Sequence, residues 1–550
     1  NPVSSLYAAS HALYAIPKKV RFSKNFEEIS INDLPKIKSW KEDGGAFITL
    51  PQVYSEDINN PGILNSNLGM YRIQLTGNKY ILNKEIGMHY QIHRGIGVHQ
   101  KNANDKNLPL KVSIFVGGPP AHTFAAVMPL PEGMSEVSFA GVLAGRRFRY
   151  AKKDGYTIST DADFVICGDL YSKDIKPEGP FGDHFGFYSL TGQYPVMHVT
   201  AITARKDAVL PATIVGLPPM EDGYLGEAIG RQFSPVLQFQ HRDVKSVHLP
   251  LETGFHNLAI VAAKQRYPRQ ARKTALGLLG AGQMMFLKAI ITVDPDQNPK
   301  DLEALLDALN DKVEIANDVI VLNGMVADSL DAASPFENVH DKLIIDATTI
   351  PQRDPRSDNE PLEGSFKQET PKWRQGLAES DIFTEIELVK EIPEVTDARM
   401  LRNNILVVTT KIDGTPSPKT GLEEFNDAAE AARIAQISQL KKSIWQLDSK
   451  KCLRWLFITN DDMDLNCKKA RRRLLWQLTS RFDVGRGLFF DDERQRLCWD
   501  ATTPIPSGKF GVRRWPAITL HSEETLEKVS SHPELSKYEW PVHLEFGGID

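Results

Sequence analysis

The heptapeptide LIIDATT at residues 343–349 occurs a second time as LCWDATT at residues 497–503. In both places a run of apolar residues ends in Asp-Ala-Thr-Thr, and earlier apolar runs and helical stretches precede it in the same order. Apolar runs that alternate with helices are typical of strand–helix–strand units around a parallel sheet. This stretch therefore predicts a duplicated C-terminal α/β domain.

The two copies can be traced backwards from their closing stretches. Two strands and a helix come before the closing strand: residues 257–264, 288–296 and 301–309 in the first copy, and residues 404–411, 454–462 and 468–479 in the second. Chance likeness between two ordinary strand–helix units is the alternative, but the shared order and the shared ending favour duplication. The polar, proline-containing stretch 353–374 is interpreted as the linker between the copies.

Upstream of the first copy the sequence changes to short β-rich runs separated by glycine and proline. Five such runs lie at residues 46–50, 71–75, 112–116, 164–167 and 196–200. This spacing predicts a β-barrel or sandwich. Residues 121–145 have helical patterns, so a small α/β insertion is expected to interrupt the barrel, and residues 224–238 are helical again.

These observations predict an α+β chain with five parts. We expect an N-terminal segment at residues 1–50, a β-barrel at 51–240 with its α/β insertion at about 107–150, the first α/β copy at 241–352, a linker at 353–390 and the second α/β copy at 391–550. A chain of 550 residues is too long for a single core, which agrees with several domains.

Composition and charge exclude several classes of protein. The chain is 41% hydrophobic and 25% charged, as in globular proteins, and its net charge is -5. No basic excess is available for nucleic-acid phosphates, and the basic cluster at residues 468–473 is interpreted as a solvated helix face. The four cysteines lie far apart without a CxxC pair, which favours a reducing compartment over a disulfide framework.

The longest apolar stretch, residues 275–293, does not predict a membrane span. Gln283 and Lys288 interrupt it, and a strand-like run ends it. A buried helix followed by a core strand is the better interpretation. No signal peptide is visible, although the first residue is Asn1 and not Met, so we expect a cytoplasmic protein.

Three polar signatures in the barrel region are candidates for a site. They are Asn67-Leu68-Gly69-Met70-Tyr71-Arg72, His89-Tyr90-Gln91-Ile92-His93-Arg94-Gly95 and Glu178-Gly179-Pro180-Phe181-Gly182-Asp183-His184. Taken singly, each signature has a simpler explanation: Glu178 could belong to a turn, His93 to the end of a strand, and Arg72 could be a surface charge. Together, Asn, His and Glu offer an amide oxygen, an imidazole nitrogen and a carboxylate, a mixed set that suits Mn²⁺ or Mg²⁺ better than structural zinc. The spacing along the chain does not show that they meet.

A fourth signature is the stretch 216–227, GLPPMEDGYLGE. Its prolines set a rigid turn, Asp222 is expected to cap the helix that follows, and Glu227 falls in the first turns of that helix. In one interpretation Glu221 and Glu227 only complement the helix dipole. In the other they flank Arg72, and one of the two carboxylates exchanges protons.

These motifs occur in the order of a known family. Asn67 to Arg72, the HRG of residues 93–95, the EGPFG of residues 178–182, the PPMED of residues 218–222 and the Asp-Ala-Thr endings together resemble the UbiD family. That family includes polyprenyl-hydroxybenzoate decarboxylase and fungal ferulic acid decarboxylase. The resemblance covers roughly residues 45–349, and the RRWP of residues 513–516 is similar to the family's C-terminus.

The resemblance implies a fold, a cofactor and a metal. A split β-barrel is expected to hold prenylated flavin mononucleotide (FMN), with an α/β domain behind it. Asn67, His93 and Glu178 match the family's ligands for Mn²⁺ or Mg²⁺, which bridges to the cofactor phosphate, and Ile92 is expected at the cofactor. A monovalent cation such as K⁺ or Na⁺ is a further expectation.

The resemblance also implies catalytic roles. Arg72 matches the arginine beside the flavin, and Glu221 and Glu227 match the acidic pair around it. Glu227 is placed by its distance from Glu178 rather than by a sharp motif. Arg72 would hold the substrate carboxylate, and Glu227 or Glu221 would protonate the carbon. Such an acid must keep its proton near neutral pH, which requires burial or a neighbouring negative charge.

Lys342, just before the first LIIDATT, matches a lysine that contacts the cofactor phosphate. Arg496 holds the equivalent place in the second copy, so the sequence leaves open which copy faces the cofactor. We expect Lys342 at the phosphate. We expect the second copy at an interface between protomers, where its apolar surface would be buried.

The resemblance predicts a carboxy-lyase that removes CO₂ from an aromatic or α,β-unsaturated carboxylic acid. A flavin prenyltransferase would supply the cofactor, and a homodimer or higher homo-oligomer is expected. One alternative is a carboxylase that runs the reverse reaction. Another is a non-catalytic flavin-binding subunit of a larger carboxylase, although a scaffold has no need of the combined polar set.

Overall fold

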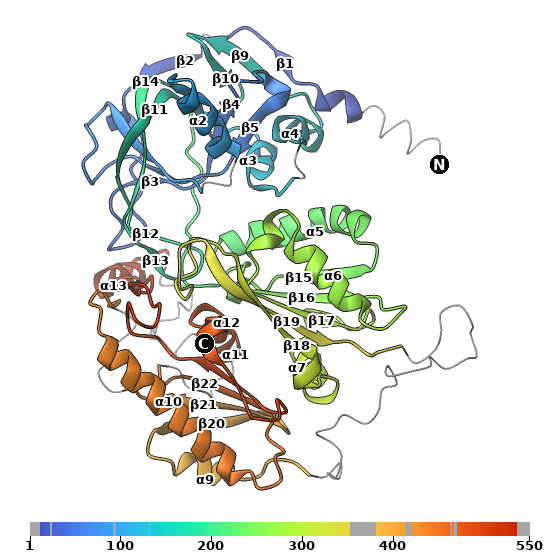
Figure 1. Ribbon diagram of the computed structural model, residues 1–550. Helices are drawn as coiled ribbons and strands as arrows, with labels where there is room; N and C mark the ends of the chain where they lie inside the picture. Colours follow the sequence, from blue (N-terminus) through green and yellow to red (C-terminus); the bar gives the residue numbers. More distant parts are fainter. Residues whose placement is uncertain are drawn as a thin grey trace. The chain divides into compact units, whose positions relative to one another are not determined.

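The computed structural model of the protein describes residues 11–22, 25–91, 95–130, 133–351, 381–412, 420–462, 465 and 470–535 (Figure 1). The chain divides into two compact units. The first unit comprises residues 1–182 and 188–215, and the second comprises residues 183–187 and 216–550. The expected linker at 353–390 lies mostly outside the described residues.

The first unit is built on one large antiparallel sheet. Its strands, in spatial order, are β3 (Phe47–Ile48), β6 (Ile73–Gln74), β7 (Glu85–Met88), β14 (Gly192–Arg205), β11 (Phe164–Glu178), β8 (Leu110–Val116), β4 (Pro51–Glu56) and β5 (Ser66–Gly69), and β2 (Phe26–Ile29) pairs with β14. Among the described residues the sheet is not closed. The split barrel therefore stays a prediction.

Two apolar clusters cover the two faces of this sheet, because successive strand residues point to opposite sides. Val112, Ile114 and Ile166 belong to one cluster, while Phe115 and Val165 belong to the other. The second cluster also contains side chains of two short helices, α3 (Pro120–Val127) and α4 (Glu136–Ala144).

The remaining elements of the unit are η1 (Leu13–Ala15), η2 (Ile31–Asp33), η3 (Ile63–Asn65), α2 (Gly95–Asp105), β1 (Lys18–Lys19), β9 (Arg149–Lys153), β10 (Tyr156–Ser159), β12 (Phe181–Gly182) and β13 (Tyr188–Ser189).

Helices α3 and α4 occupy the stretch in which the sequence predicts helices. Helix α3 begins with Pro120, whose missing N–H would have no partner in a first turn. Helix α4 is capped by the Ser135 hydroxyl and ends at Gly145, whose φ of 63° is a left-handed conformation that suits glycine. The helices predicted at residues 121–145 are thus confirmed, and the bounds of an α/β insertion stay a prediction.

The second unit contains two five-stranded sheets. We refer to β15 (Val244–His248), β16 (Leu258–Ala263), β17 (Ala289–Val293), β19 (Val339–Ala347) and β18 (Val319–Val326), in spatial order, as the first sheet. Its helices are α5 (Asp222–Gln240), η4 (Leu251–Thr253), α6 (Gln270–Leu279), η5 (Gly282–Phe286), α7 (Leu302–Asp311) and α8 (Ile315–Asp318).

The second sheet has, in spatial order, β20 (Val395–Arg402), β21 (Ile405–Thr410), β22 (Trp455–Asn460), β24 (Leu497–Ala501) and β23 (Leu488–Phe490). Its helices are α9 (Ile386–Lys390), α10 (Asp427–Leu447), α11 (Ala470–Ser480) and α12 (Val484–Gly487), and α13 (Glu523–Ser531) follows. In both sheets the three middle strands are parallel and the two edge strands are antiparallel to their neighbours. The two sheets thus share one strand order, as the sequence repeat predicts.

The Asp-Ala-Thr-Thr endings also make the same hydrogen bonds. Thr348 Oγ1 donates to Asp346 Oδ1 at 2.5 Å, and Thr502 Oγ1 donates to Asp500 Oδ1 at 2.6 Å. The backbone N–H of the next threonine then donates to a residue at the end of the neighbouring strand. In the first sheet this is Asp294, just after β17, at 2.8 Å, and in the second it is Asn460, the last residue of β22, at 2.7 Å.

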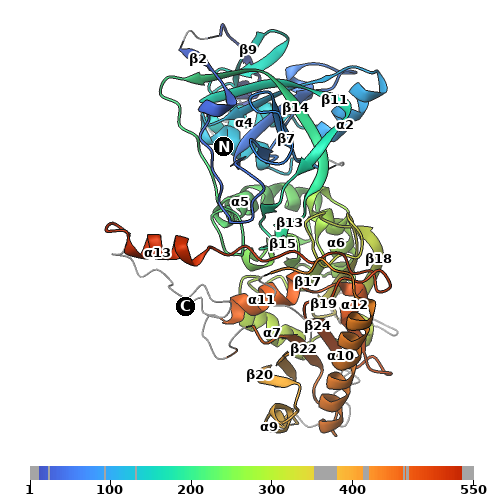
Figure 2. The ribbon, with the colours of Figure 1, turned by 90° about the vertical axis from the view of Figure 1, so that its left-hand side faces the viewer.

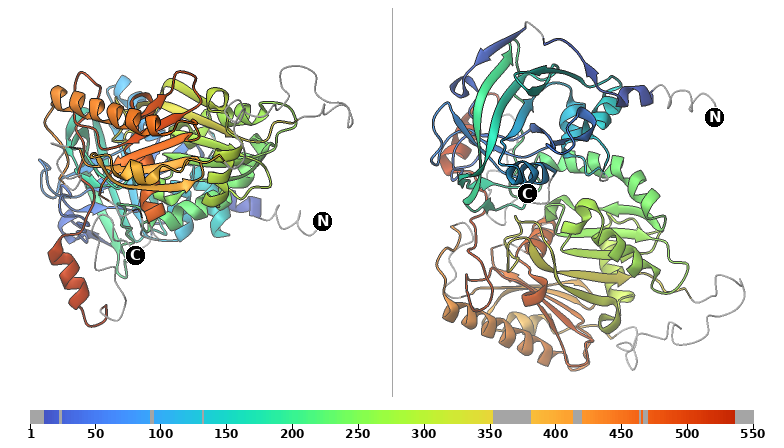
Figure 3. Two further views of the ribbon diagram at one scale, coloured as in Figure 1. Left: turned by 90° about the horizontal axis from the view of Figure 1, so that it is seen from below. Right: turned by 45° about the horizontal axis from the view of Figure 1, so that its top comes forward.

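The two sheets bury a common core. One cluster joins alternate residues of β16 and β21 with side chains of α7 and α11, while the opposite faces pack under α6 and α10 (Figures 1 and 2). Figure 3 shows α10 along the outer side of the second sheet. The apolar faces of the second sheet are therefore covered within the same chain, and an interface between protomers at this copy stays a prediction.

Two buried cations connect the sheets reciprocally. Lys288, just before β17, donates to the carbonyl oxygens of Thr479 and Phe482, both at 2.9 Å. Arg454, just before β22, donates to the carbonyl oxygens of Asn310 at 3.3 Å and Val313 at 2.6 Å. Each cation thus satisfies carbonyl groups at the C-terminal end of a helix associated with the other sheet.

The apolar stretch 275–293 forms the end of α6, the short helix η5 and the core strand β17. The predicted buried helix followed by a core strand is confirmed. Among the helices in the described part of the chain, none combines the length and the apolarity that a membrane crossing needs.

Candidate active site

Glu178 and Arg72 form a buried ion pair in the first unit. Glu178 is the last residue of β11, and Arg72 lies between β5 and β6. Arg72 Nε donates to Glu178 Oε1 at 2.9 Å and Arg72 Nη2 to Glu178 Oε2 at 2.8 Å, a bidentate arrangement that fixes both side chains. Arg72 Nη2 also donates to Ser189 Oγ at 2.8 Å. The structure thus brings together two residues that lie 106 positions apart in the sequence.

The surroundings keep the Glu178 carboxylate charged. Burial alone would raise its pKa, but the charge of Arg72 and hydrogen bonds with His89 and Arg72 lower the pKa to about 2. His89 Nδ1 lies 2.9 Å from Glu178 Oε2, and its ring stacks on Tyr194 with the centroids 4.1 Å apart. The site therefore holds a permanent negative charge with two ordered donors around it.

Asn67, the third member of the predicted site, lies in β5. Its Oδ1 accepts a hydrogen bond from the Tyr71 hydroxyl at 3.3 Å, and its buried Nδ2 has no hydrogen-bond partner among the residues that the structure describes. A side chain at Gly95 would bring a Cβ within 2.4 Å of Asn67 Oδ1, so glycine keeps space open beside that oxygen. His93 and Ile92 lie outside the described residues.

An amide oxygen with free space beside it and a buried, charged carboxylate are hard donors for a divalent cation. Asn67 and Glu178 therefore fit the expected metal chemistry. Glu178 would use lone pairs that its bonds with Arg72 and His89 leave available, since each carboxylate oxygen has two. The ligand set of Asn67, His93 and Glu178 itself stays a prediction.

Glu221 and Glu227 belong to the second unit. Glu221 is the N-cap residue of α5, so the prediction that Asp222 caps this helix is wrong by one residue. Glu227 is partly exposed and accepts hydrogen bonds from Arg231 at 2.9 Å and Lys300 at 3.2 Å. These contacts lower its pKa. In this position Glu227 is ionised at neutral pH and has no proton to donate.

Asp222 has the electrostatics that a proton donor needs, a property that the sequence interpretation missed. Burial raises its pKa to about 6, with a further rise from Asp183 and an opposing effect of His184. His184 is held by Asp183, since its Nδ1 lies 2.9 Å from Asp183 Oδ1. That hydrogen bond and the charge of Asp183 outweigh burial and raise the pKa of His184 to about 9. The signal available in the sequence was the DH dipeptide at residues 183–184, directly after the Glu178 motif.

Lys342 is buried in β19. Its Nζ donates to the carbonyl oxygens of Met285 at 2.8 Å and Leu287 at 2.5 Å and lies 3.1 Å from His340 Nε2. Burial lowers its pKa to about 7, against the opposing charge of Asp331. A contact with a phosphate therefore requires Lys342 to leave these carbonyl groups, and its role at the cofactor stays a prediction.

Arg496, the counterpart of Lys342, is engaged within the second sheet. Its Nε donates to Asp491 Oδ2 at 3.2 Å, and its guanidinium lies 4.7 Å from the centroid of the Trp445 ring. These contacts connect the turn before β24 to the end of α10. They give Arg496 a structural role in this part of the chain.

Two family models match the sequence. The "3-octaprenyl-4-hydroxybenzoate carboxy-lyase Rift-related domain" matches residues 15–218, and the "3-octaprenyl-4-hydroxybenzoate carboxy-lyase C-terminal domain" matches residues 223–347. Together they cover more than half of the chain, which identifies a carboxy-lyase. The chain belongs to the UbiD family. Both models end before the second sheet.

Known proteins agree with this assignment. A protein of Chlamydia pneumoniae that is named as one of the subunits of 4-hydroxybenzoate decarboxylase is 36% identical over 352 residues, which are 62% of this chain and 59% of that protein. This chain thus spans less than two thirds of that relative. The vanillic acid decarboxylase of Sedimentibacter hydroxybenzoicus, in its closed form, has a TM-score of 0.57 at 26% identity and covers 67% of this chain and 80% of its own.

The UbiD-class enzyme HmfF from Pelotomaculum thermopropionicum, whose structure is a complex with FMN, has a TM-score of 0.53. It is 22% identical to this chain, and the likeness covers 64% of this chain and 80% of its own. At this level of identity the likeness shows the fold alone.

Proposed function

We propose that the protein is a decarboxylase of an aromatic or α,β-unsaturated carboxylic acid that uses prenylated FMN and a divalent metal. The observation that carries this proposal is the buried pair of Arg72 and Glu178, a fixed cation beside a fixed anion. Membership of the UbiD family supports it, and so do the names of two relatives, which describe decarboxylases of 4-hydroxybenzoate and vanillate.

The chemistry requires an electron sink, because loss of CO₂ from an sp² carbon leaves electrons that no side chain can accept. The modified flavin supplies that sink when it is bound. Asn67, His93 and Glu178 would hold the metal, and Lys342 would bind the cofactor phosphate. A split barrel in the first unit would form the cofactor site.

Arg72 has the chemistry to bind the substrate carboxylate. Its guanidinium is oriented by Glu178 and stacks over the ring of Phe181, 4.7 Å from its centroid. A preoriented guanidinium binds a carboxylate with little further loss of side-chain entropy. The role of Arg72 would thus be to bind and orient the acid before CO₂ departs.

The proton that replaces CO₂ needs a carboxylic acid that is protonated near neutral pH. Glu221 and Glu227 are the residues that the family resemblance implies. The raised pKa of Asp222 makes it a third candidate. Glu227 would need to leave Arg231 and Lys300 before it could act, because both contacts favour its ionised form.

Activity of the chain produced together with a flavin prenyltransferase tests this proposal. CO₂ release from 4-hydroxybenzoate, vanillate and cinnamate-type acids is measured by product chromatography. Glu178→Gln should lose metal, cofactor and turnover together, whereas Arg72→Lys should keep the cofactor and lose turnover. Arg149→Lys is the matched control, because Arg149 also pairs with a buried carboxylate in the first unit, that of Asp161.

The proton donor is tested in the same assay. Asp222→Asn, Glu221→Gln and Glu227→Gln are compared, and loss of the acid should slow turnover by about 100- to 10,000-fold with the cofactor still bound. A chain that binds the flavin but is inactive on every acid unless a second protein is added would contradict the proposal. It would favour the non-catalytic subunit instead.

A further inference from the structure

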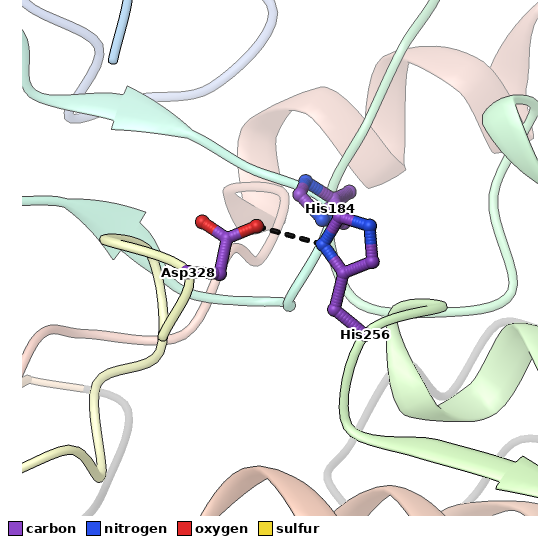
Figure 4. Close-up of side chains that lie close together, drawn as sticks. All are labelled: His184, His256 and Asp328. Atoms are coloured by element: carbon purple, nitrogen blue, oxygen red, sulfur yellow. Dashed lines mark hydrogen bonds and ion pairs between the residues drawn. The ribbon is translucent and has the colours of Figure 1, made fainter. Parts of the chain in front are cut away.

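The second unit contains a cluster of two histidines and one aspartate whose ligand atoms converge (Figure 4). One ligand atom from each of His184, His256 and Asp328 lies within 4.8 Å of the others. Within the described ranges, no other group of histidine, cysteine, aspartate or glutamate side chains has this spacing. We propose that His184, His256 and Asp328 bind a divalent transition-metal ion, at a site separate from Asn67, His93 and Glu178.

The three ligands come from separate loops of the same unit. His184 follows β12, His256 lies between η4 and β16, and Asp328 follows β18. Asp328 is buried, and its Oδ1 accepts a hydrogen bond from the backbone N–H of Leu330 at 3.0 Å. Its Oδ2 lies 2.7 Å from His256 Nδ1, so the carboxylate and the imidazole already point at each other.

The distances fit a metal ion after small movements. A tetrahedral transition metal holds imidazole nitrogen and carboxylate oxygen at about 2.0–2.2 Å, so any two of its ligands lie about 3.3–3.6 Å apart. The ligand atoms of the cluster lie within 4.8 Å of one another, so the widest separation has to close by at most about 1.5 Å. Side-chain rotation of His184 or His256 supplies such a movement without any change in the backbone.

A second carboxylate orients one of the ligands. Asp183 accepts from His184 at Nδ1, at 2.9 Å, which directs the other ring nitrogen of His184 away from Asp183. Carboxylate–histidine–metal chains of this kind fix the tautomer and the direction of the ligating ring. Aromatic rings surround the cluster, since His184 packs on Phe185 and Phe255 and His256 packs on Phe286. Rings of this kind limit the access of water.

The ligand chemistry indicates which ion would bind. Two imidazoles and one carboxylate suit zinc, iron(II), cobalt(II) or manganese(II), whereas calcium and magnesium prefer all-oxygen sites. Three protein ligands leave at least one position for an oxygen ligand, such as water or a small anion. This inference does not depend on the proposed decarboxylase activity.

Cobalt binding to the chelator-treated, flavin-free full chain tests the site. Co²⁺ is titrated while visible absorption is recorded, and bound metal is counted by elemental analysis after dialysis. We expect His256→Ala and Asp328→Asn to lose one ion per chain and its absorption, while Glu178→Gln keeps both. Asp183→Asn should weaken this ion about 10- to 100-fold, because second carboxylates typically contribute that much.

Two further variants keep the test decisive. His248→Ala, a half-buried histidine of β15 outside the cluster, should bind cobalt as the wild type does. Asp328→Glu, which restores a carboxylate, should recover part of the affinity that Asp328→Asn loses. Unchanged metal content and absorption in folded His256→Ala and Asp328→Asn overturn the proposal, whatever is found for Glu178→Gln or for turnover.

Discussion

The first and second sheets have the same strand order, but the connections before their last strands differ. Between β18 and β19 the chain runs through residues 327–338, which we refer to as the long connection, whereas β23 and β24 are joined by the short turn of residues 491–496. The long connection supplies Asp328 and Asp331. The short turn supplies Asp491, which accepts a hydrogen bond from Arg496 at the other end of the same turn. The long connection thus brings two buried carboxylates to the first sheet, whereas the carboxylate of the short turn is paired within that turn.

The long connection is held in place by residues from several parts of the unit. Asp331 accepts from Lys288 at 2.9 Å and lies 3.0 Å from His340 Nδ1. Arg513 donates to the carbonyl oxygens of Asp331 at 2.6 Å and Ser334 at 3.0 Å. Residues of the first sheet and of the C-terminal stretch thus hold the loop that carries Asp328.

Removal of the two cations that connect the sheets, Lys288 and Arg454, should give the largest difference in the free energy of unfolding. Lys288→Met leaves Asp331 buried without its cation, which we expect to lower the free energy of unfolding by about 3–5 kcal/mol. Arg454→Met leaves only neutral carbonyl groups without a partner and should cost about 1–3 kcal/mol. Urea unfolding of both variants measures the difference, with the exposed Lys450→Met as control. A larger loss in Arg454→Met would contradict this assignment of roles.

The next comparison concerns the counterparts Lys342 and Arg496. If Lys342 reaches the cofactor phosphate, Lys342→Ala should weaken prenylated FMN binding by roughly 10- to 100-fold, as expected for loss of one charge-assisted hydrogen bond. Arg496→Ala should leave the affinity unchanged, because Arg496 binds Asp491 and Trp445. Fluorescence titration of the flavin measures both. Loss of affinity in the arginine variant alone would mean that the sheets have exchanged roles.

The stability that the long connection contributes should fall at low pH, when Asp331 becomes protonated. Burial raises the pKa of this carboxyl, but Lys288 and His340 lower it from 3.8 to about 2. Because the folded-state pKa is below the unfolded value, the stabilisation is present above pH 3.8 and is lost as the pH falls through 2. The amount is about 2 kcal/mol. Asp331→Asn should remove this part of the pH dependence of unfolding, whereas Asp207→Asn, at an exposed carboxylate, should not.

The smallest loss of stability is expected from the threonines of the two Asp-Ala-Thr-Thr endings, and it should be nearly equal in the two sheets. Thr348→Val and Thr502→Val each remove one hydrogen bond to the aspartate of the Asp-Ala-Thr-Thr ending, at a cost of about 1 kcal/mol. Thr502→Val should cost slightly more, since Thr502 Oγ1 also accepts from Arg433 at 2.6 Å. Thermal unfolding measures both. An effect in only one sheet would argue against equivalence of the two endings.

Much of the fold could be predicted from the sequence because its signals are local. The apolar runs that end in Asp-Ala-Thr-Thr indicated the strands, and the stretch 275–293 indicated a helix followed by a core strand. The covering of the second sheet could not be predicted. An apolar face on a strand has the same pattern whether it packs on another chain or on a sheet of the same chain.

In the candidate site too, contacts between residues far apart in the sequence could not be predicted. Compact motifs made Asn67, Arg72 and Glu178 candidates, but the bidentate pair between Arg72 and Glu178 was not foreseen. The raised pKa of Asp222 depends on its burial and on Asp183, a distant neighbour in the chain. No pattern within one stretch of sequence contains that information.

The sequence by itself determined the family motifs, the order of strands and helices and the repeated endings, because each depends on residues close together in the chain. Only the tertiary structure decided which side of each sheet is covered, which cation satisfies which carbonyl group and which histidines meet Asp328. Those outcomes depend on loops far apart in sequence, such as residues 183–187 and 327–338, that folding brings to one place. Burial then sets the charge of the groups, since the cost of ionisation depends on the surrounding atoms and not on the order of residues.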